Sequence, residues 1–130
     1  MALQWTGFYA AWIGLITLAL AWQVVRQRRQ LKIGVGDADN RGLRLRVRAH
    51  ANLTEYAPIA LILLGCSEAS GAPVWLVHGG GLALVLGRVL HPWGLLGGNG
   101  GYHIGRFTGT LLTWLSILVS ALYLLVMALL

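Results

Sequence analysis

Four apolar stretches, each near the length of a membrane-spanning helix, take up most of this chain of 130 residues. They cover roughly residues 5–25, 45–66, 74–90 and 107–130. About 20 apolar residues cross a bilayer as a helix. Only 11% of the residues are charged, so no room remains for a separate soluble domain. We therefore expect one all-α integral membrane domain over residues 1–130, an up-down four-helix bundle with helices at roughly 5–32, 43–68, 74–93 and 106–130.

The 10 lysines and arginines are concentrated near the two links that such a bundle places at one end. Most of them surround the first link, and Arg88 and Arg106 flank the last one. Excess lysine and arginine marks the cytoplasmic loops of membrane proteins. We therefore expect residues 26–44 and 93–106 to face the cytoplasm and both termini to face the opposite side. This placement accounts for the net charge of +6 without nucleic acid as a partner.

Several common kinds of site are not expected in this chain. One cysteine, Cys66, excludes an intrachain disulfide and a cysteine-based zinc cluster, and we expect it to be a packed, inert thiol. The histidines lack metal-ligand spacing, so we expect no metal. Residues 94–105 are glycine-rich and are expected to form a loop, without the spacing of a phosphate-binding motif. Gly105 and Gly109 form a small-xxx-small pair that favours helix packing.

Four polar residues share one face of the second stretch. On a helix that advances about 100° per residue, they fall within a stripe roughly 80° wide. They are Arg44, Arg48, Asn52 and Glu55. Charge at membrane depth is costly and faces partner helices or a polar cavity. Glu55 therefore either pairs with Arg48 or Arg88 to neutralise it, or it contributes to a ligand site.

The charges of the stripe describe a complementary ligand. Guanidiniums hold carboxylates through paired hydrogen bonds, and Glu55 favours an ammonium group beside them. A small anionic peptide with a free amine fits this pattern, and so does a phospholipid headgroup such as phosphatidylserine. Arg88 and His91 lie three residues apart, on one face of the third helix and near the same end. Arg106 opens the fourth helix there, as a site residue or as a snorkelling interfacial anchor.

The segment Arg48-Ala-His-Ala-Asn52, followed by Glu55 and Pro58, resembles the signature of the MAPEG family, the membrane-associated proteins in eicosanoid and glutathione metabolism. Gly87-Arg-Val-Leu-His91 resembles the third-helix pattern of that family. The layout with basic links covers nearly the whole chain, and the chain looks most like the short bacterial members. The resemblance therefore implies an inner membrane location with both termini in the periplasm.

The resemblance also implies a homotrimer with one glutathione site at each subunit interface, near the cytoplasmic face. The first-helix member of that site is matched by Arg28 or Arg29, less securely than the others. The residues that we predict to bind glutathione are Arg28, Arg44, Arg48, Asn52, Glu55, Arg88 and His91. Arg106 is the predicted catalytic residue, because an arginine at the base of the fourth helix stabilises the glutathione thiolate in the active enzymes.

The expected activity is that of a glutathione transferase or peroxidase acting on a lipophilic electrophile or hydroperoxide from the bilayer. Synthesis of cysteinyl leukotrienes is not favoured, because His91 and Leu95 stand where those enzymes carry tyrosines. Two alternatives stay open: a non-catalytic lipid-binding or scaffold protein of the same fold, and a small multidrug transporter. The arginines beside Glu55 argue against the transporter, because they would repel cations.

Overall fold

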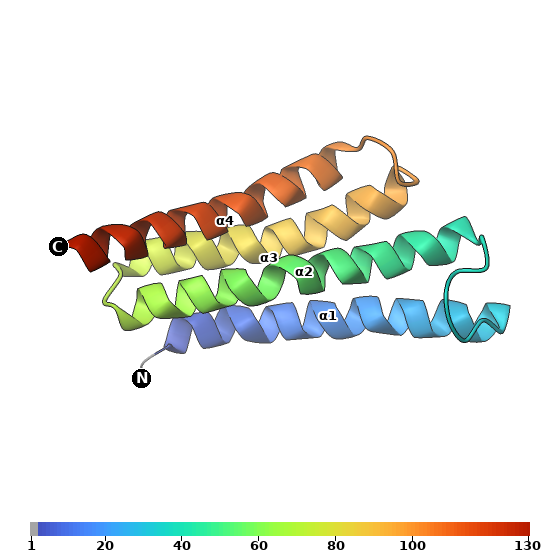
Figure 1. The fold of residues 1–130 in the computed structure, drawn as a ribbon, viewed down its shortest axis with the longest axis horizontal. Coiled ribbons are helices and arrows are strands. Elements are labelled where there is room, and N and C mark those ends of the chain that lie inside the picture. The colour runs from blue at the N-terminus through green and yellow to red at the C-terminus, as the bar shows by residue number, and fades with distance from the viewer. Residues whose placement is uncertain (1–2) are drawn as a thin grey trace.

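The computed structural model describes residues 3–130, which form four antiparallel helices joined by short connections (Figure 1). The helices are α1 (Gln4–Leu31), α2 (Arg41–Ala69), α3 (Val74–Gly97) and α4 (Ile104–Leu129). The start of α1 and the end of α4 lie at one end of the bundle, and the α1–α2 and α3–α4 connections lie at the other. α2 and α3 each pack against the three other helices, whereas α1 and α4 lie on opposite sides of that central pair. The expected up-down four-helix fold is confirmed.

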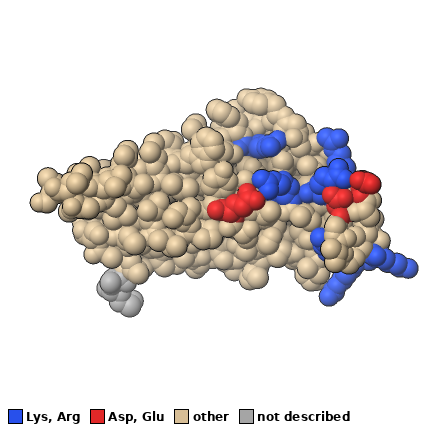
Figure 2. Space-filling model, in the orientation of Figure 1, with Lys and Arg blue, Asp and Glu red and all other residues tan. Residues whose placement is uncertain are grey.

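Three of the helices, α1, α3 and α4, are by length and composition apolar enough to cross a membrane. α2 is as long as they are, but four arginines in its first half make it more polar. Large apolar side chains are exposed on the outer faces of α1 and α4, where lipid rather than water would cover them. Figure 2 shows that the charged side chains on the visible face gather toward the end that carries the two basic links, and that uncharged residues form the rest of that face. The chain is an integral membrane protein.

The end of α3 differs from our expectation. We expected a helix to residue 93 and a loop over 94–105, but α3 continues through Pro92 to Gly97 and α4 begins at Ile104. α3 ends where Asn99 and Gly100 turn to positive φ angles of 49° and 82°. Glycine adopts such angles without steric cost, so the chain reverses there. The helical part of the glycine-rich segment packs against α4, and this tertiary contact overrides the low helix propensity of glycine.

Small residues let α3 and α4 approach until their backbones touch. A methyl group at Gly87 would lie 2.7 Å from the carbonyl oxygen of Gly109, and one at Gly109 would lie 2.5 Å from the backbone nitrogen of His91. Ser116 adds a hydrogen bond of 2.8 Å from its hydroxyl to the carbonyl oxygen of Gly80. Close backbone approach of this kind is how helices associate in lipid. The predicted packing role of Gly109 is confirmed.

At the other end of the bundle, Glu68 of α2 caps the start of α1. Its two carboxylate oxygens accept hydrogen bonds from the backbone N–H groups of Trp5 and Thr6, at 2.9 Å and 2.7 Å. Residue 3, which precedes α1, provides no side-chain cap. Partial burial acts to raise the pKa of the Glu68 carboxyl, but the hydrogen bonds from Thr6 and Trp5 outweigh it and hold that pKa below its ordinary value of 4.5. Glu68 therefore stabilises the α1–α2 contact as an anion.

One further expectation was wrong. Cys66 is exposed on the surface of the chain rather than packed inside it. The residue next to it, Ser67, is fully buried and turns its hydroxyl back to the carbonyl oxygen of Leu63. Neighbouring helical positions point about 100° apart, so only one of this pair can face the core.

Gly109→Ala should destabilise the protein by about 1–3 kcal/mol, because the added methyl group forces α4 away from α3. Gly79→Ala is a matched control, since a methyl group there has no atom within 4 Å and alanine raises helix propensity. Thermal unfolding in detergent micelles measures both effects. Equal melting temperatures for the two variants would contradict the close α3–α4 contact.

Glu68→Gln should lower the stability at neutral pH by about 1–2 kcal/mol, because the α1 cap loses its charge. A carboxyl whose pKa is lowered by folding stabilises the protein above its unfolded pKa and loses that contribution as the pH falls through the folded pKa. The difference between wild type and variant should therefore be largest above about pH 5 and shrink toward pH 3. Unfolding temperatures measured across this range test the prediction, and a pH-independent difference would contradict it.

Candidate functional site

Three of the predicted arginines line one cavity of about 370 Å³ at the basic end of the bundle. Arg28 comes from α1, and Arg44 and Arg48 come from α2. The remaining lining residues are Gly36, Asp37, Val47 and Ala51. A peptide of a few residues with carboxylate groups matches this volume and this charge. Arg44 and Arg48 lie four residues apart and therefore share one face of α2. The α1–α2 connection brings this face close to the end of α1, which carries Arg28.

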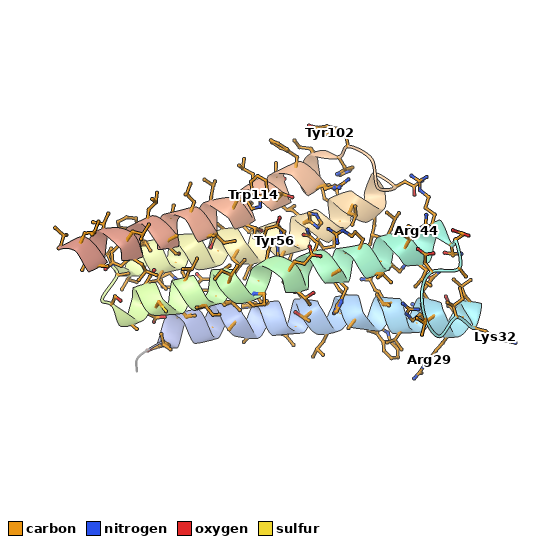
Figure 3. The ribbon with its side chains drawn as sticks, in the orientation of Figure 1. Arg29, Lys32, Arg44, Tyr56, Tyr102 and Trp114 are labelled. Carbon is orange, nitrogen blue, oxygen red and sulfur yellow. The ribbon has the colours of Figure 1, made fainter. Side chains whose placement is uncertain are left out.

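The α1–α2 connection holds two of these arginines in place. Arg44 forms ion pairs with Asp37 at 2.6 Å and Asp39 at 3.0 Å, and Figure 3 marks its position at the start of α2. The Arg44 side chain, through its hydrogen bond, holds the pKa of the Asp37 carboxyl below its ordinary value. Arg28 donates to the carbonyl oxygens of Gly34 and Gly36, at 3.3 Å and 2.8 Å. These contacts orient the guanidiniums and leave further donors free.

Glu55 pairs with Arg48, one of the two partners that the sequence left open. Their atoms lie 2.9 Å and 3.4 Å apart in a two-pronged arrangement. The side chains are 58% and 47% exposed, so the pair lies on the surface of the single chain. Both charged groups are therefore open to a ligand or to a neighbouring subunit. A zwitterionic ligand could exchange with the pair, its carboxylate on Arg48 and its ammonium on Glu55.

Asn52 and Arg88 meet inside the bundle rather than at the surface. Arg88 is 1% exposed, and its Nη1 donates to Oδ1 of Asn52 at 2.8 Å. Its Nη2 donates to the carbonyl oxygen of Gly109 at 3.4 Å, and its guanidinium lies 5.8 Å from the centre of the Tyr56 ring. His91, also buried, lies one helical turn further along α3. This buried cluster joins α2, α3 and α4.

Arg106 lines a different cavity, of about 310 Å³, on the outer side of α4. Its Nη1 donates to the carbonyl oxygens of Gly100 and Gly101, at 2.8 Å and 3.3 Å. The other lining residues are mainly apolar or aromatic and include Tyr102 and Trp114, which Figure 3 labels. The Arg106 cavity shares no lining residue with the cavity of the three arginines. Within one chain, Arg106 and the Arg48 stripe therefore line separate cavities.

The sequence did not predict one contact at this end, between Arg41 and Asn99. Arg41 donates through Nε to Oδ1 of Asn99 at 3.0 Å and through Nη2 to the carbonyl oxygen of Asn99 at 2.6 Å. It thereby ties the first turn of α2 to the loop whose carbonyl groups hold Arg106. Arg41 looked like one more positive-inside residue, because its partner lies 58 positions away in the sequence.

Comparison with known proteins decides the family. The MAPEG family model matches residues 6–126, which include α2, α3 and nearly all of α1 and α4. The chain belongs to the MAPEG family. The predicted resemblance, which covered nearly the whole chain, is confirmed.

This MAPEG member is similar to the inner membrane protein YecN of Escherichia coli K12 and to its counterpart in Escherichia coli O6:H1. It is 32% identical to each over 121 residues, which cover 90% of this chain and 87% of the relative. The name of the relative states that it is an inner membrane protein and assigns no reaction to it. No solved structure matches the chain.

The Arg88–Asn52 contact can be measured with a double-mutant cycle. Asn52→Leu should destabilise the protein by about 2–4 kcal/mol, because the buried Arg88 guanidinium loses its side-chain acceptor. Arg88→Met should destabilise it by about 1–3 kcal/mol, because the half-buried Asn52 amide is left unpaired. The double variant should be more stable than the sum of the two losses by about 1–3 kcal/mol. Unfolding in detergent provides the measurement. Strict additivity would show that the two side chains do not stabilise one another.

Proposed function

We propose that this MAPEG member is a membrane-bound, glutathione-dependent transferase or peroxidase. The observation that carries the proposal is the cavity lined by Arg28, Arg44 and Arg48, with the exchangeable Glu55 carboxylate on the same helix. Glutathione carries two carboxylates and one ammonium group. The guanidiniums would hold its carboxylates, and Glu55 would receive its ammonium group. Membership of a family that includes glutathione enzymes supports the same ligand.

Arg106 would supply the reactive form of glutathione. Hydrogen bonds to the loop carbonyls engage only its Nη1, so Nη2 and Nε remain available to an anion. A guanidinium beside the sulfur lowers the thiol pKa from about 8.5 toward neutrality, and each unit corresponds to about 1.4 kcal/mol in favour of the thiolate. The thiolate sulfur then forms a bond to an electrophilic carbon and displaces its leaving group. With a hydroperoxide it attacks the terminal oxygen, which breaks the O–O bond, releases an alcohol after protonation and leaves the sulfenic acid of glutathione. A second glutathione then displaces water from that sulfenic acid and gives glutathione disulfide.

The apolar lining of the Arg106 cavity supports a lipophilic second substrate. Phe107, Leu111 and Trp114 line it on the outer face of α4, where a molecule dissolved in the bilayer has direct access. The pairing of one guanidinium with an apolar wall suits an amphipathic reactant. The same cavity also suits a lipid that is bound without reaction, which keeps a non-catalytic lipid-binding role as the second candidate.

A homotrimer would complete the site. The three-arginine cavity and the Arg106 cavity share no residue, so glutathione bound in the first needs Arg106 from a neighbouring subunit. In such a trimer, α4 of one subunit would bring its Arg106 to α2 of the next subunit. Rotational symmetry would repeat this contact at every interface of the closed ring. We place this assembly in a bacterial inner membrane, with the basic links in the cytoplasm and both termini in the periplasm. The name of the relative from Escherichia coli supports the inner membrane location, and the charge bias of the links supports the orientation.

Titration calorimetry with glutathione tests the proposal. Arg48→Gln should weaken binding about tenfold or more, because a paired guanidinium–carboxylate contact is lost. Arg106→Ala should bind glutathione within a few-fold of wild type but lose about a hundredfold or more in conjugation rate and lose the thiolate absorbance band. Lys32→Gln, which removes a charge outside both cavities, is the control and should change neither quantity.

Co-expression of Arg48→Gln with Arg106→Ala, assayed at a glutathione concentration too low to saturate Arg48→Gln, tests the shared site. If Arg48 and Arg106 act across an interface, mixed trimers contain some sites with both native arginines and recover part of the activity. No recovery would place both residues in one subunit. The absence of heat and of thermal protection at millimolar glutathione would overturn the proposal in favour of lipid binding.

A further inference from the structure

A third cavity, of about 320 Å³, lies between α1 and α2 at the basic end and is lined by polar side chains throughout. Its lining residues are Gln23, Arg26, Gln27, Gln30 and Arg46. None of them lines the three-arginine cavity or the Arg106 cavity. The proposed glutathione chemistry therefore leaves this cavity without a role.

Helical spacing explains how the cavity forms. The four residues from α1 occupy positions i, i+3, i+4 and i+7, which share one face of a helix. Arg46 reaches them from α2, on the side of that helix nearly opposite to the Arg48 stripe. Its Nη1 donates to the carbonyl oxygen of Gly42 at 3.0 Å, which holds the side chain and leaves other donors free. Arg26 and the three glutamines make no side-chain hydrogen bond within residues 3–130.

No carboxylate of the chain neutralises this cavity. The chain has 4 acidic residues, and none of them lines it. Asp37 and Asp39 pair with Arg44, and Glu55 pairs with Arg48. The fourth, Glu68, caps α1 at the far end of the bundle. Two guanidiniums and three amides thus converge on a space where an anion from outside the chain can bind.

The depth of the cavity in the membrane indicates where that anion comes from. Trp22 precedes Gln23 and is 59% exposed, as expected of a side chain in the interfacial belt. Residues 23–30 continue α1 beyond this belt by about 10 Å, at 1.5 Å per residue. That is the level of lipid phosphates. Basic pockets between membrane helices at this level suit anionic headgroups.

We propose that the Arg26–Arg46 cavity binds a phosphate group, and that an anionic phospholipid is its source. The two guanidiniums hold the phosphate oxygens, because their planar forks match phosphate geometry. The glutamine amides donate to the remaining ester and glycerol oxygens. A lipid bound there fastens the cytoplasmic ends of α1 and α2 to the membrane surface. This site is independent of glutathione binding.

Native mass spectrometry of the protein released from micelles tests the site, with phosphatidylglycerol and phosphatidylcholine as competing probes. The wild type should retain phosphatidylglycerol in preference to phosphatidylcholine. Arg26→Gln/Arg46→Gln should reduce that preference about tenfold. Arg29→Gln/Lys32→Gln removes the same charge from the end of α1, where both side chains extend away from α2 (Figure 3), and should reduce it less than threefold.

Two further arms separate specific binding from general attraction and identify the source of the phosphate. Arg26→Lys/Arg46→Lys keeps the charge and the fold but loses the forks, so an intermediate loss is expected. Glycerol 3-phosphate is titrated in the absence of anionic lipid. Binding of that compound to the wild type without any preference for phosphatidylglycerol would make the source soluble. Equal lipid preference in the two glutamine variants, with no binding of glycerol 3-phosphate, would overturn the proposal.

Discussion

Arg88 is a charge enclosed in an apolar bundle, and its guanidinium joins three of the four helices. It lies on α3, donates to Asn52 of α2 and donates to the Gly109 carbonyl of α4. A buried guanidinium without such acceptors would carry a large desolvation cost. The contact is possible only because Gly109 lets the α4 backbone approach α3. The packing of the small residues and the position of Arg88 therefore depend on one another.

This arrangement also decides which polar groups reach the surface. Since Asn52 turns inward to Arg88, Glu55 lies outside and pairs with Arg48. An exposed pair can exchange with a charged ligand, whereas the buried cluster holds the helices that present it. Arg106 lies at the same end of the bundle and donates to the carbonyl oxygen of Gly100. Arg41 ties the loop that contains Gly100 to α2. Structural and candidate binding roles are thus divided between the inner and outer faces of α2.

Much of the fold could be predicted from the sequence, but the arrangement of the site could not. The lengths of the apolar stretches and the spacing of the charges predict four helices and a polar stripe on the second. The motif around Arg48 predicts the MAPEG family, which the family model confirms. Periodicity places Arg44, Arg48, Asn52 and Glu55 within a stripe about 80° wide on one side of a helix. It cannot tell that Asn52 lies at the buried edge of that stripe, because burial depends on where α3 packs.

The sequence by itself determined that this chain is a bundle of membrane helices with its positive charge at one end, because lipid excludes open backbone and exposed charge. Only the tertiary structure decided the partners of each charge. Glu55 had two possible arginines, Glu68 was an unremarked residue near a turn, and the helix after Pro92 was expected to be a loop. Glu55 pairs with Arg48 seven residues away, although Arg88 of another helix was the alternative. Glu68 binds backbone groups 63 and 62 residues away, and Gly94 packs against the α4 backbone at Arg106. Local spacing does not constrain such distances, whereas the close packing of glycine-bearing helices does.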